Sequence, residues 1–264
     1  MIKSEFLLSD SEVADFLANG YHIAKPDLAD GVNEKIAQQL DNLDYNPGDA
    51  ILDTVPELKQ VIEHPVVQGV LTSLLGKDYE VQSHRHWHCR TSGMGSMKWH
   101  QDGLNKREVG INRFLGLYYP RDVTPDMGPT VIVPGTQFRN APSDRMATYG
   151  NIKGQIPLVV KAGTIALAHY DIWHGTGANT SGVKRHMVKF LFRRTAENTE
   201  PTWNHDLEGD KKARDWNLKG ESKNAVDILT FSNPLSVAQS DHYKDRTIRR
   251  KCWDLLLGEP ADEV

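Results

Sequence analysis

Four residues in two separated stretches of the chain carry the side chains best suited to chemistry. His100 and Asp102 lie in the stretch KWHQDG, and His174 and Arg185 lie in IWHGTGANTSGVKRH. A His-x-Asp pair followed by a distant His is the ligand set of the 2-His-1-carboxylate facial triad, which binds ferrous iron and leaves coordination positions open. An arginine eleven residues after the last His adds a planar, two-pronged carboxylate binder. Together these residues predict an iron(II) oxygenase that uses 2-oxoglutarate.

The metal interpretation has to be weighed against chance, because the chain contains 11 histidines. His-x-Asp alone is a weak motif, and the alternative is three unrelated polar residues. If residues 99–102 are extended, the side chains of His100 and Asp102 point to the same side of the strand. His174 must then come from a distant strand, as a β-barrel allows. The order His-x-Asp, His and Arg favours the metal site.

The bulk properties of the chain indicate one soluble domain. All-β barrels and sandwiches of about 264 residues are often single domains. A net charge of −4 and a pI near 6.3 do not suggest a nucleic-acid partner. We expect neither a signal peptide nor a membrane span. The two cysteines, Cys89 and Cys252, belong to no motif, so a reducing, cytoplasmic setting is expected. The oligomeric state is not predicted.

The first part of the domain, about residues 1–78, is predicted to be mainly helical. A capping box at Ser9 to Glu12 begins a helix, and Gly20 ends it. The other elements expected here are a strand at 21–24, a helix around 32–40 with apolar residues every fourth position, a loop at 43–54, and two helical segments with Pro56 and Pro65 near their first turns, the second ended by Gly76.

The pattern changes to short strands in the central part, about residues 79–195. Strands are predicted at 79–90, 112–119, 130–133, 157–160, 164–168 and 186–193, with turn residues between them. Such a series is typical of an antiparallel sandwich or barrel. The last part, about 196–264, is predicted to be a helical extension with helices around 223–231 and 241–257. The basic run from Lys244 to Lys251 is interpreted as a solvated helix face.

Several motifs resemble the phytanoyl-CoA dioxygenase family of iron(II)/2-oxoglutarate oxygenases. The resemblance extends over about residues 10–195. The matching pieces are His100-Gln101-Asp102, Met127-Gly128-Pro129 followed by Val133 to Gln137, Lys161-Ala162-Gly163, His174 to Asn179 with Arg185, the N-terminal helix before Gly20-Tyr21, and the Pro56 to Gly76 segment with His64-Pro65.

The resemblance implies a mainly β fold, a double-stranded β-helix (a cupin-like jelly roll) with N-terminal and C-terminal helices packed outside. It implies a dioxygenase that uses Fe(II), 2-oxoglutarate and dioxygen to hydroxylate or otherwise oxidise a small-molecule metabolite, with release of succinate and CO2. The metal ligands and catalytic centre implied are His100, Asp102 and His174. Related halogenases have Gly or Ala in place of the carboxylate, so Asp102 favours hydroxylation over halogen transfer.

The resemblance also implies a binding site for the cosubstrate. Arg185 is expected to pair with the far carboxylate of 2-oxoglutarate, and the hydroxyl of Thr176 is expected to contact the same carboxylate. Gln82 or Ser83 is expected to line the cosubstrate pocket. Two other functions stay open. A non-catalytic cupin-like metal-binding protein would not need the carboxylate clamp that Arg185 and Thr176 form, and a non-oxidative metalloenzyme could use the same triad with another metal.

The predicted strand 79–90 is rich in histidine. Alternation places Gln82, His86 and His88 on one face and Trp87 on the other. In one interpretation the histidine face is a wall of the active-site cavity and contacts the substrate through His86 and His88. In the other, it faces solvent while Trp87 lies in the core. The first interpretation favours a polar or amino-acid-like substrate.

Overall fold

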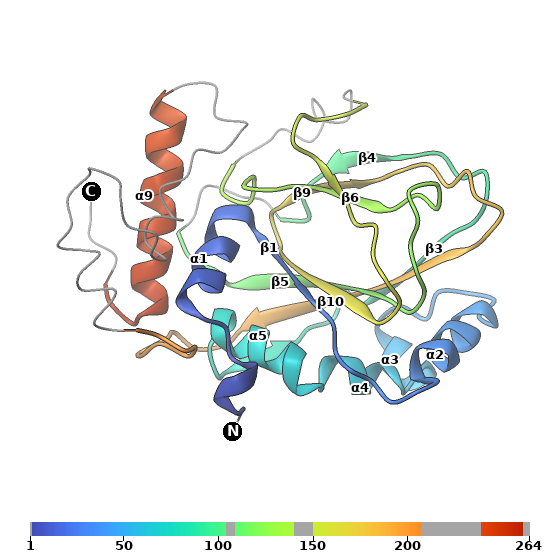
Figure 1. Cartoon of the computed structure of the whole chain (residues 1–264), viewed down its shortest axis with the longest axis horizontal. Coiled ribbons are helices and arrows are strands. Elements are labelled where there is room, and N and C mark those ends of the chain that lie inside the picture. Colours follow the sequence, from blue (N-terminus) through green and yellow to red (C-terminus); the bar gives the residue numbers. More distant parts are fainter. Residues whose placement is uncertain (1, 104–108, 140–149, 207–238, 261–264) are drawn as a thin grey trace.

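Two antiparallel β-sheets face each other, and helices cover the outer face of the larger sheet (Figure 1). The computed structural model describes residues 2–103, 109–139, 150–206 and 239–260. The larger sheet has the strand order β1-β8-β5-β10-β2, with β3 also pairing with β10, and the smaller has the order β4-β9-β6-β7. All of these pairings are antiparallel. This arrangement is the expected jelly roll with flanking helices.

The bounds of the elements follow the chain order. The strands are β1 Tyr21–Ala24, β2 Tyr79–Val81, β3 His86–Arg90, β4 Met97–His100, β5 Arg113–Tyr119, β6 Thr130–Val133, β7 Ile156–Pro157, β8 Thr164–His169, β9 Trp173–Thr176 and β10 Arg185–Arg194. The α-helices are α1 Asp10–Asn19, α2 Val32–Asp41, α3 Ile51–Thr54, α4 Leu58–Ile62, α5 Pro65–Leu75 and α9 Gln239–Leu256, and two 3-10 turns are η1 Ser4–Phe6 and η2 Gly48–Ala50. None of the helices in the described part of the chain is long and apolar enough to cross a membrane.

Local signals position α1 against the sheet. The Ser9 side chain accepts a hydrogen bond from the Glu12 amide, and the Glu12 carboxylate accepts one from the Ser9 amide, which confirms the capping box. Gly20 ends the helix with φ 80°, a left-handed conformation that glycine adopts without strain. A Cβ at Gly20 would also collide with Gln137. The chain therefore turns directly from α1 into β1.

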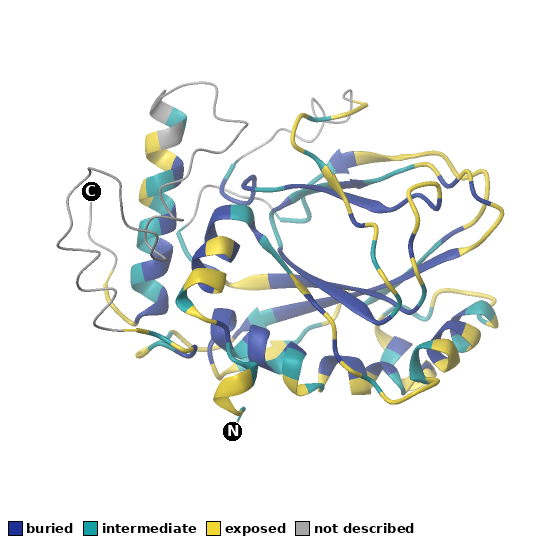
Figure 2. Ribbon diagram, viewed as in Figure 1, coloured by how far each residue is buried: buried dark blue, intermediate teal, exposed yellow. Residues whose placement is uncertain are grey.

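Alternation along β10 divides its side chains between two apolar layers. Phe190 and Phe192 join the larger core cluster, between the helices and the sheet, whereas Met187 and Leu191 join the cluster between the two sheets. These positions are almost fully buried, as Figure 2 shows for most of the larger sheet. Burying a side chain of this size stabilises the fold by about 1.5–3 kcal/mol. Every second residue of β10, counted from Met187 in both directions, therefore points to the side of the sheet that faces the smaller sheet.

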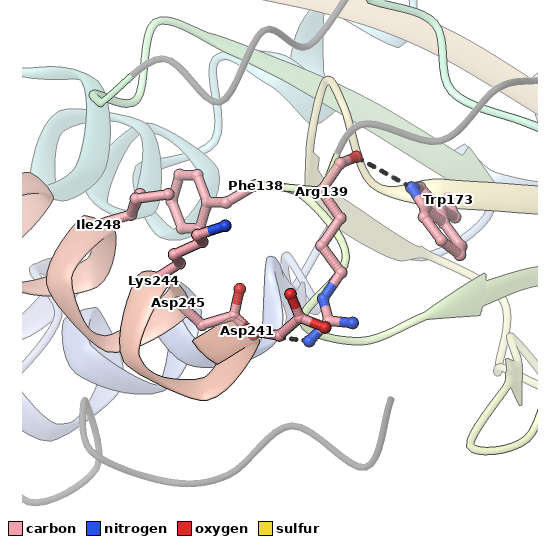
Figure 3. Close-up of a pocket in the computed structure, with 7 residues that line it drawn as sticks. All are labelled: Phe138, Arg139, Trp173, Asp241, Lys244, Asp245 and Ile248. Carbon is pink, nitrogen blue, oxygen red and sulfur yellow. Dashed lines mark hydrogen bonds and ion pairs between the residues drawn. The ribbon is translucent and has the colours of Figure 1, made fainter. Parts of the chain in front are cut away.

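The C-terminal helix α9 packs on the helical side of the molecule. Trp253 belongs to the core cluster that contains α1, and its ring centroid lies 5.6 Å from that of Trp203. The interpretation of the basic run as a solvated face is wrong for Asp245 and Arg249, which are 6% and 2% exposed. Helical periodicity places both on the stripe that includes Trp253. Asp245 and Arg139 form a 2.7 Å ion pair, and both residues border a small pocket beside Trp173 (Figure 3).

Other predicted elements differ from the structure in instructive ways. The predicted loop at 43–54 contains η2 and α3, and the predicted strand 157–160 is reduced to Ile156–Pro157. Strand β9 provides the distant strand expected for His174, although the apolar pattern does not define its bounds, because Trp-His-Gly-Thr has no apolar alternation. The predicted helix around 223–231 lies outside the described residues, whereas α9 confirms the one at 241–257.

The predicted strand 79–90 is interrupted after Val81. His84 has φ 78°, which is uncommon for a residue other than glycine. The backbone amide of Arg85 donates to the Asp49 carboxylate at 2.9 Å, and the Arg85 guanidinium donates to the Asp49 carbonyl. These contacts hold the segment 82–85 against η2, and β3 begins only at His86.

Candidate metal and cosubstrate site

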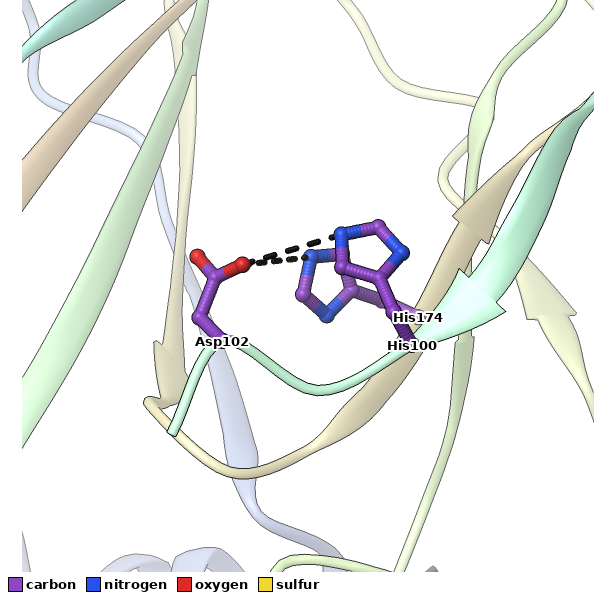
Figure 4. Close-up of side chains that lie close together, drawn as sticks. All are labelled: His100, Asp102 and His174. Carbon is purple, nitrogen blue, oxygen red and sulfur yellow. Dashed lines mark ion pairs between the residues drawn. The ribbon is translucent and has the colours of Figure 1, made fainter. Parts of the chain in front are cut away.

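Three side chains expected to bind metal come together between the sheets. His100 and His174 are Cα partners in the β4–β9 ladder, and their ring centroids lie 4.2 Å apart. The other neighbour of His174 is Ile132, which belongs to the apolar cluster between the sheets. Asp102 Oδ1 lies 3.6 Å from His100 Nε2 and 3.8 Å from His174 Nε2 (Figure 4). The three ligand atoms lie within 4.8 Å of one another, a compact one-sided donor set.

Backbone carbonyls orient both imidazole rings. Nδ1 of His100 lies 2.9 Å from the Lys98 carbonyl, and Nδ1 of His174 lies 3.0 Å from the Ile172 carbonyl. A protonated Nδ1 donates to each carbonyl, so the lone pair of Nε2 faces Asp102. Burial, followed by the nearby His100, lowers the pKa of His174 to about 4. The ring is therefore neutral near pH 7, the state that binds a metal, and the donor set fits ferrous iron.

A lysine that the sequence analysis did not single out holds the other oxygen of the carboxylate. Lys189 Nζ donates to Asp102 Oδ2 at 3.0 Å and lies 3.1 Å from His84 Nε2. Burial alone would raise the pKa of Asp102, but His174 and Lys189 together lower it, so the carboxylate stays ionised. The signal in the sequence was a single charge inside the apolar run Met187 to Phe192.

Arg185 faces the same interior space as Lys189. It is 2% exposed, and its Nη2 donates to the Gly128 carbonyl at 3.0 Å. Its Nε and Nη1 atoms are buried and have no hydrogen-bond partner among the described residues. Unpaired buried donors are costly, so this edge of the guanidinium is suited to a planar anion such as a carboxylate. Burial lowers the pKa of Arg185, although an arginine remains charged at neutral pH.

The structure brings Thr176 to the metal side of the smaller sheet. Thr176 is two residues after His174 in β9 and pairs with Thr130 of β6. The Thr130 hydroxyl accepts a 2.9 Å hydrogen bond from Tyr119, whose hydroxyl interacts electrostatically with Arg185. Strand register thus places Thr176 on the same face of the smaller sheet as His174 and opposite Thr130.

Gln82 is not brought to this site. Its amide donates to the Leu191 carbonyl, and its side chain donates to Glu80 at 3.3 Å. Leu191 is six residues from Arg185 along β10, roughly 20 Å at the rise of a β-strand. The structure therefore does not place Gln82 beside Arg185, and a contact of Gln82 with the cosubstrate stays a prediction. The reason is the interruption after Val81, which leaves Gln82 at the opposite end of β10.

His86 and His88 lie on the inward side of β3. They pair with Lys189 and Met187 of β10, whereas Trp87 donates to His186 on the other face at 3.0 Å. His88 Nε2 is buried and has no partner in the described part of the chain. Burial, followed by Lys189, lowers the pKa of His88 to about 4, so this ring is neutral. The histidine face therefore points to the interior.

Comparisons with known proteins agree with this geometry. Residues 2–187 match the family model described as phytanoyl-CoA dioxygenase (PhyH). No protein of curated function matches the sequence. The fold resembles HygX from Streptomyces hygroscopicus, solved with nickel and 2-oxoglutarate, with a TM-score of 0.58 and 15% identity over 70% of this chain and 86% of that chain.

Two enzymes of nogalamycin biosynthesis have the same fold. The non-heme α-ketoglutarate dependent carbocyclase SnoK has a TM-score of 0.57 and 17% identity over 84% of this chain and 97% of its own. The epimerase SnoN has a TM-score of 0.55 and 16% identity over 69% of this chain and 81% of its own. At these identities the structures support the fold, while the sequence match spans most of the chain. This protein belongs to the phytanoyl-CoA dioxygenase family of iron(II)/2-oxoglutarate-dependent oxygenases.

Proposed function

We propose that this protein is an Fe(II)/2-oxoglutarate-dependent dioxygenase that oxidises a small molecule and releases succinate and CO2. The observation that carries the proposal is the pairing of two features in one interior space. One is the compact donor set of His100, Asp102 and His174. The other is the buried edge of Arg185, whose N–H groups have no partner among the described residues. A site that only bound metal would not need the second feature.

Each residue has a separate task in this proposal. His100, Asp102 and His174 hold the ion by one face, and Arg185 with Thr176 holds the far carboxylate of 2-oxoglutarate. A bound ferrous ion supplies the activation of dioxygen and the oxidative decarboxylation of 2-oxoglutarate. The side chain of His100 is 34% exposed, against 11% for His174, so His100 is the more accessible of the two histidine ligands.

The substrate is proposed to be a small polar molecule, such as an amino-acid-like metabolite. Support comes from His86 and His88, which present imidazole groups to the interior from β3. A structural neighbour supports a small-molecule substrate, since SnoN has been solved in complex with Fe3+, α-ketoglutarate and nogalamycin RO. Pockets that bind such ligands combine apolar walls with a few placed polar groups.

The test is succinate formation from 2-oxoglutarate under air, with and without iron(II). We expect iron-dependent succinate that rises when a substrate is present, and none above background in His174→Ala. Because the relatives include an epimerase and a carbocyclase, products are scored for gain of one oxygen, loss of two hydrogens or unchanged mass. Absence of succinate with every candidate substrate would leave a metal-binding protein, and turnover with Zn(II) alone would indicate non-oxidative chemistry.

A further inference from the structure

A second buried arginine lies directly opposite Arg185. Arg90 of β3 and Arg185 of β10 are Cα partners in an antiparallel ladder, so their side chains leave the sheet on the same side. Arg90 is 8% exposed and Arg185 is 2% exposed. Like charges directly opposite each other destabilise a sheet, and burial without a counter-charge increases the cost. The pair therefore needs an anion.

Each guanidinium is anchored at one end and unpaired at the other. Nη2 of Arg185 donates to the Gly128 carbonyl, and Nη2 of Arg90 donates to the Gly95 carbonyl. The buried Nε of Arg90, like Nε and Nη1 of Arg185, has no hydrogen-bond partner in the described part of the chain. Buried polar groups in folded proteins are nearly always paired. Three unpaired donors on two facing arginines are thus a feature that a bound carboxylate explains.

The electrostatic surroundings of Arg185 are consistent with an anion site. Burial is the main cause that lowers its pKa, Arg90 lowers it further, and no carboxylate is among the groups that raise it in the described part of the chain. Asp102, the carboxylate of the metal site, is already paired with Lys189. A ligand would therefore supply the counter-charge to the two guanidinium groups.

We propose that Arg90 is a second ligand of the far carboxylate of 2-oxoglutarate and forms a two-arginine clamp with Arg185. This inference rests on the proposed function and adds a residue that the His-x-Asp, His and Arg motif does not contain. A carboxylate between the guanidiniums accepts hydrogen bonds from the unpaired N–H groups and removes the like-charge repulsion. The clamp lies on β3 and β10 and uses no metal ligand, so it binds a diacid without iron.

The clamp predicts effects of opposite sign for ligand-free and ligand-bound protein. Arg90→Met removes the like-charge pair, so the ligand-free variant should melt at the same temperature as wild type or higher. The same change removes donors to the carboxylate, so stabilisation by a diacid should be lost. A purely structural arginine would behave differently, because its removal would lower the melting temperature with and without ligand.

The experiment titrates metal-free protein with glutarate, which lacks the keto group and so isolates the carboxylate contacts. Binding is measured by calorimetry and by the rise in Tm. We expect Arg90→Met to bind at least about tenfold more weakly than wild type, with Arg90→Lys in between because lysine keeps the charge and loses the planar fork. Arg193→Met is the matched control, since Arg193 lies on β10 but is 43% exposed and paired with Glu80.

A second arm compares 2-oxoglutarate with 2-oxovalerate, the same keto acid without the far carboxylate. Arg90→Met should raise KM for 2-oxoglutarate with little change in kcat, and should leave any turnover of 2-oxovalerate unaltered. Glutarate binding within about twofold of wild type by folded Arg90→Met and Arg90→Lys would overturn the clamp, as would wild type that does not bind glutarate. Succinate formation with a dispensable Arg90 would reject the clamp alone, and Arg90-dependent glutarate binding without succinate would reject the proposed function alone.

Discussion

Replacing Lys189 by Met should make the metal-free protein less stable and its metal affinity higher. The Lys189 Nζ and Asp102 Oδ2 atoms are 3.0 Å apart, and their side chains are 9% and 12% exposed. At an effective dielectric constant of about 20, two unit charges at this distance attract by about 5 kcal/mol. Removing one partner of a buried pair typically costs about 3–5 kcal/mol, because the other charge is left uncompensated. For a protein of this size that is a fall in Tm of roughly 6–20 °C.

A bound divalent ion should offset the loss of stability, because it replaces the lysine as counter-charge for Asp102. The Tm of the variant should therefore rise more on addition of Co(II) or Fe(II) than the Tm of wild type does. The variant should also bind the ion at least about tenfold more tightly. Calorimetric melting with and without Co(II) measures both effects. Lys184→Met is the control, since Lys184 is exposed and precedes β10. Equal stability of metal-free Lys189→Met and wild type, or equal stabilisation of both by Co(II), would refute the reasoning.

The pH dependence of the metal-free proteins gives an independent check. In wild type the pKa of Asp102 is lowered, so its contribution to stability is complete above about pH 4 and is lost as the pH falls below that value. In Lys189→Met the charge and the hydrogen bond of Lys189 are lost while burial, which raises the pKa, remains, so the pKa of Asp102 should lie above its wild-type value. The stability gained as Asp102 loses its proton should therefore be smaller than in wild type, and the slope of stability against pH near 4 should be flatter or reversed. A variant with the wild-type slope in this range would contradict the assignment of Lys189 as a counter-charge of Asp102.

Four further substitutions test three separate parts of the site. Arg185→Lys should retain iron but bind 2-oxoglutarate roughly ten- to a hundredfold more weakly, from the loss of about 1.5–3 kcal/mol, and an unchanged dissociation constant in an anaerobic titration of the charge-transfer band would exclude Arg185 as the clamp. Asp102→Gly should abolish hydroxylation without efficient halogenation, and robust chlorinated product in a chloride-containing assay would show that the pocket already accommodates halide. Ala at His86 or His88 should impair substrate-coupled turnover more than it impairs iron or cosubstrate binding, and normal coupled turnover in both variants would remove these histidines from the substrate site.

The helical elements could be predicted because their signals are local. The Ser9–Glu12 capping box and the glycine at position 20 define α1 within the span of the helix itself. The same holds for α5, where Pro65 occupies the first turn and Gly76 follows the last. Strand 79–90 could not be predicted correctly, since its interruption depends on Arg85 contacting Asp49, which is 36 residues away.

In the site, too, some features could be predicted from the sequence and others depend on contacts between distant residues. The types and order of His100, Asp102, His174 and Arg185 are enough to predict a ferrous centre with a carboxylate binder, because few other functions need that combination. Positions that depend on strand pairing were not accessible in this way. The register of β3 on β10 places one arginine opposite another, and the interruption after Val81 leaves Gln82 beside Leu191, at the other end of β10.

The types and order of the amino acids are enough to predict which residues bind the metal and the cosubstrate. They are not enough to predict which other side chains contact those residues. A ligand set is recognisable because metal preference belongs to the side chains themselves. The role of Lys189 as partner of Asp102, and the pairing of Arg90 with Arg185, arise only when β10 pairs with β3 and the two sheets close over the interior. Burial then turns ordinary surface charges into groups that require a counter-charge, and burial is a property of the folded structure alone.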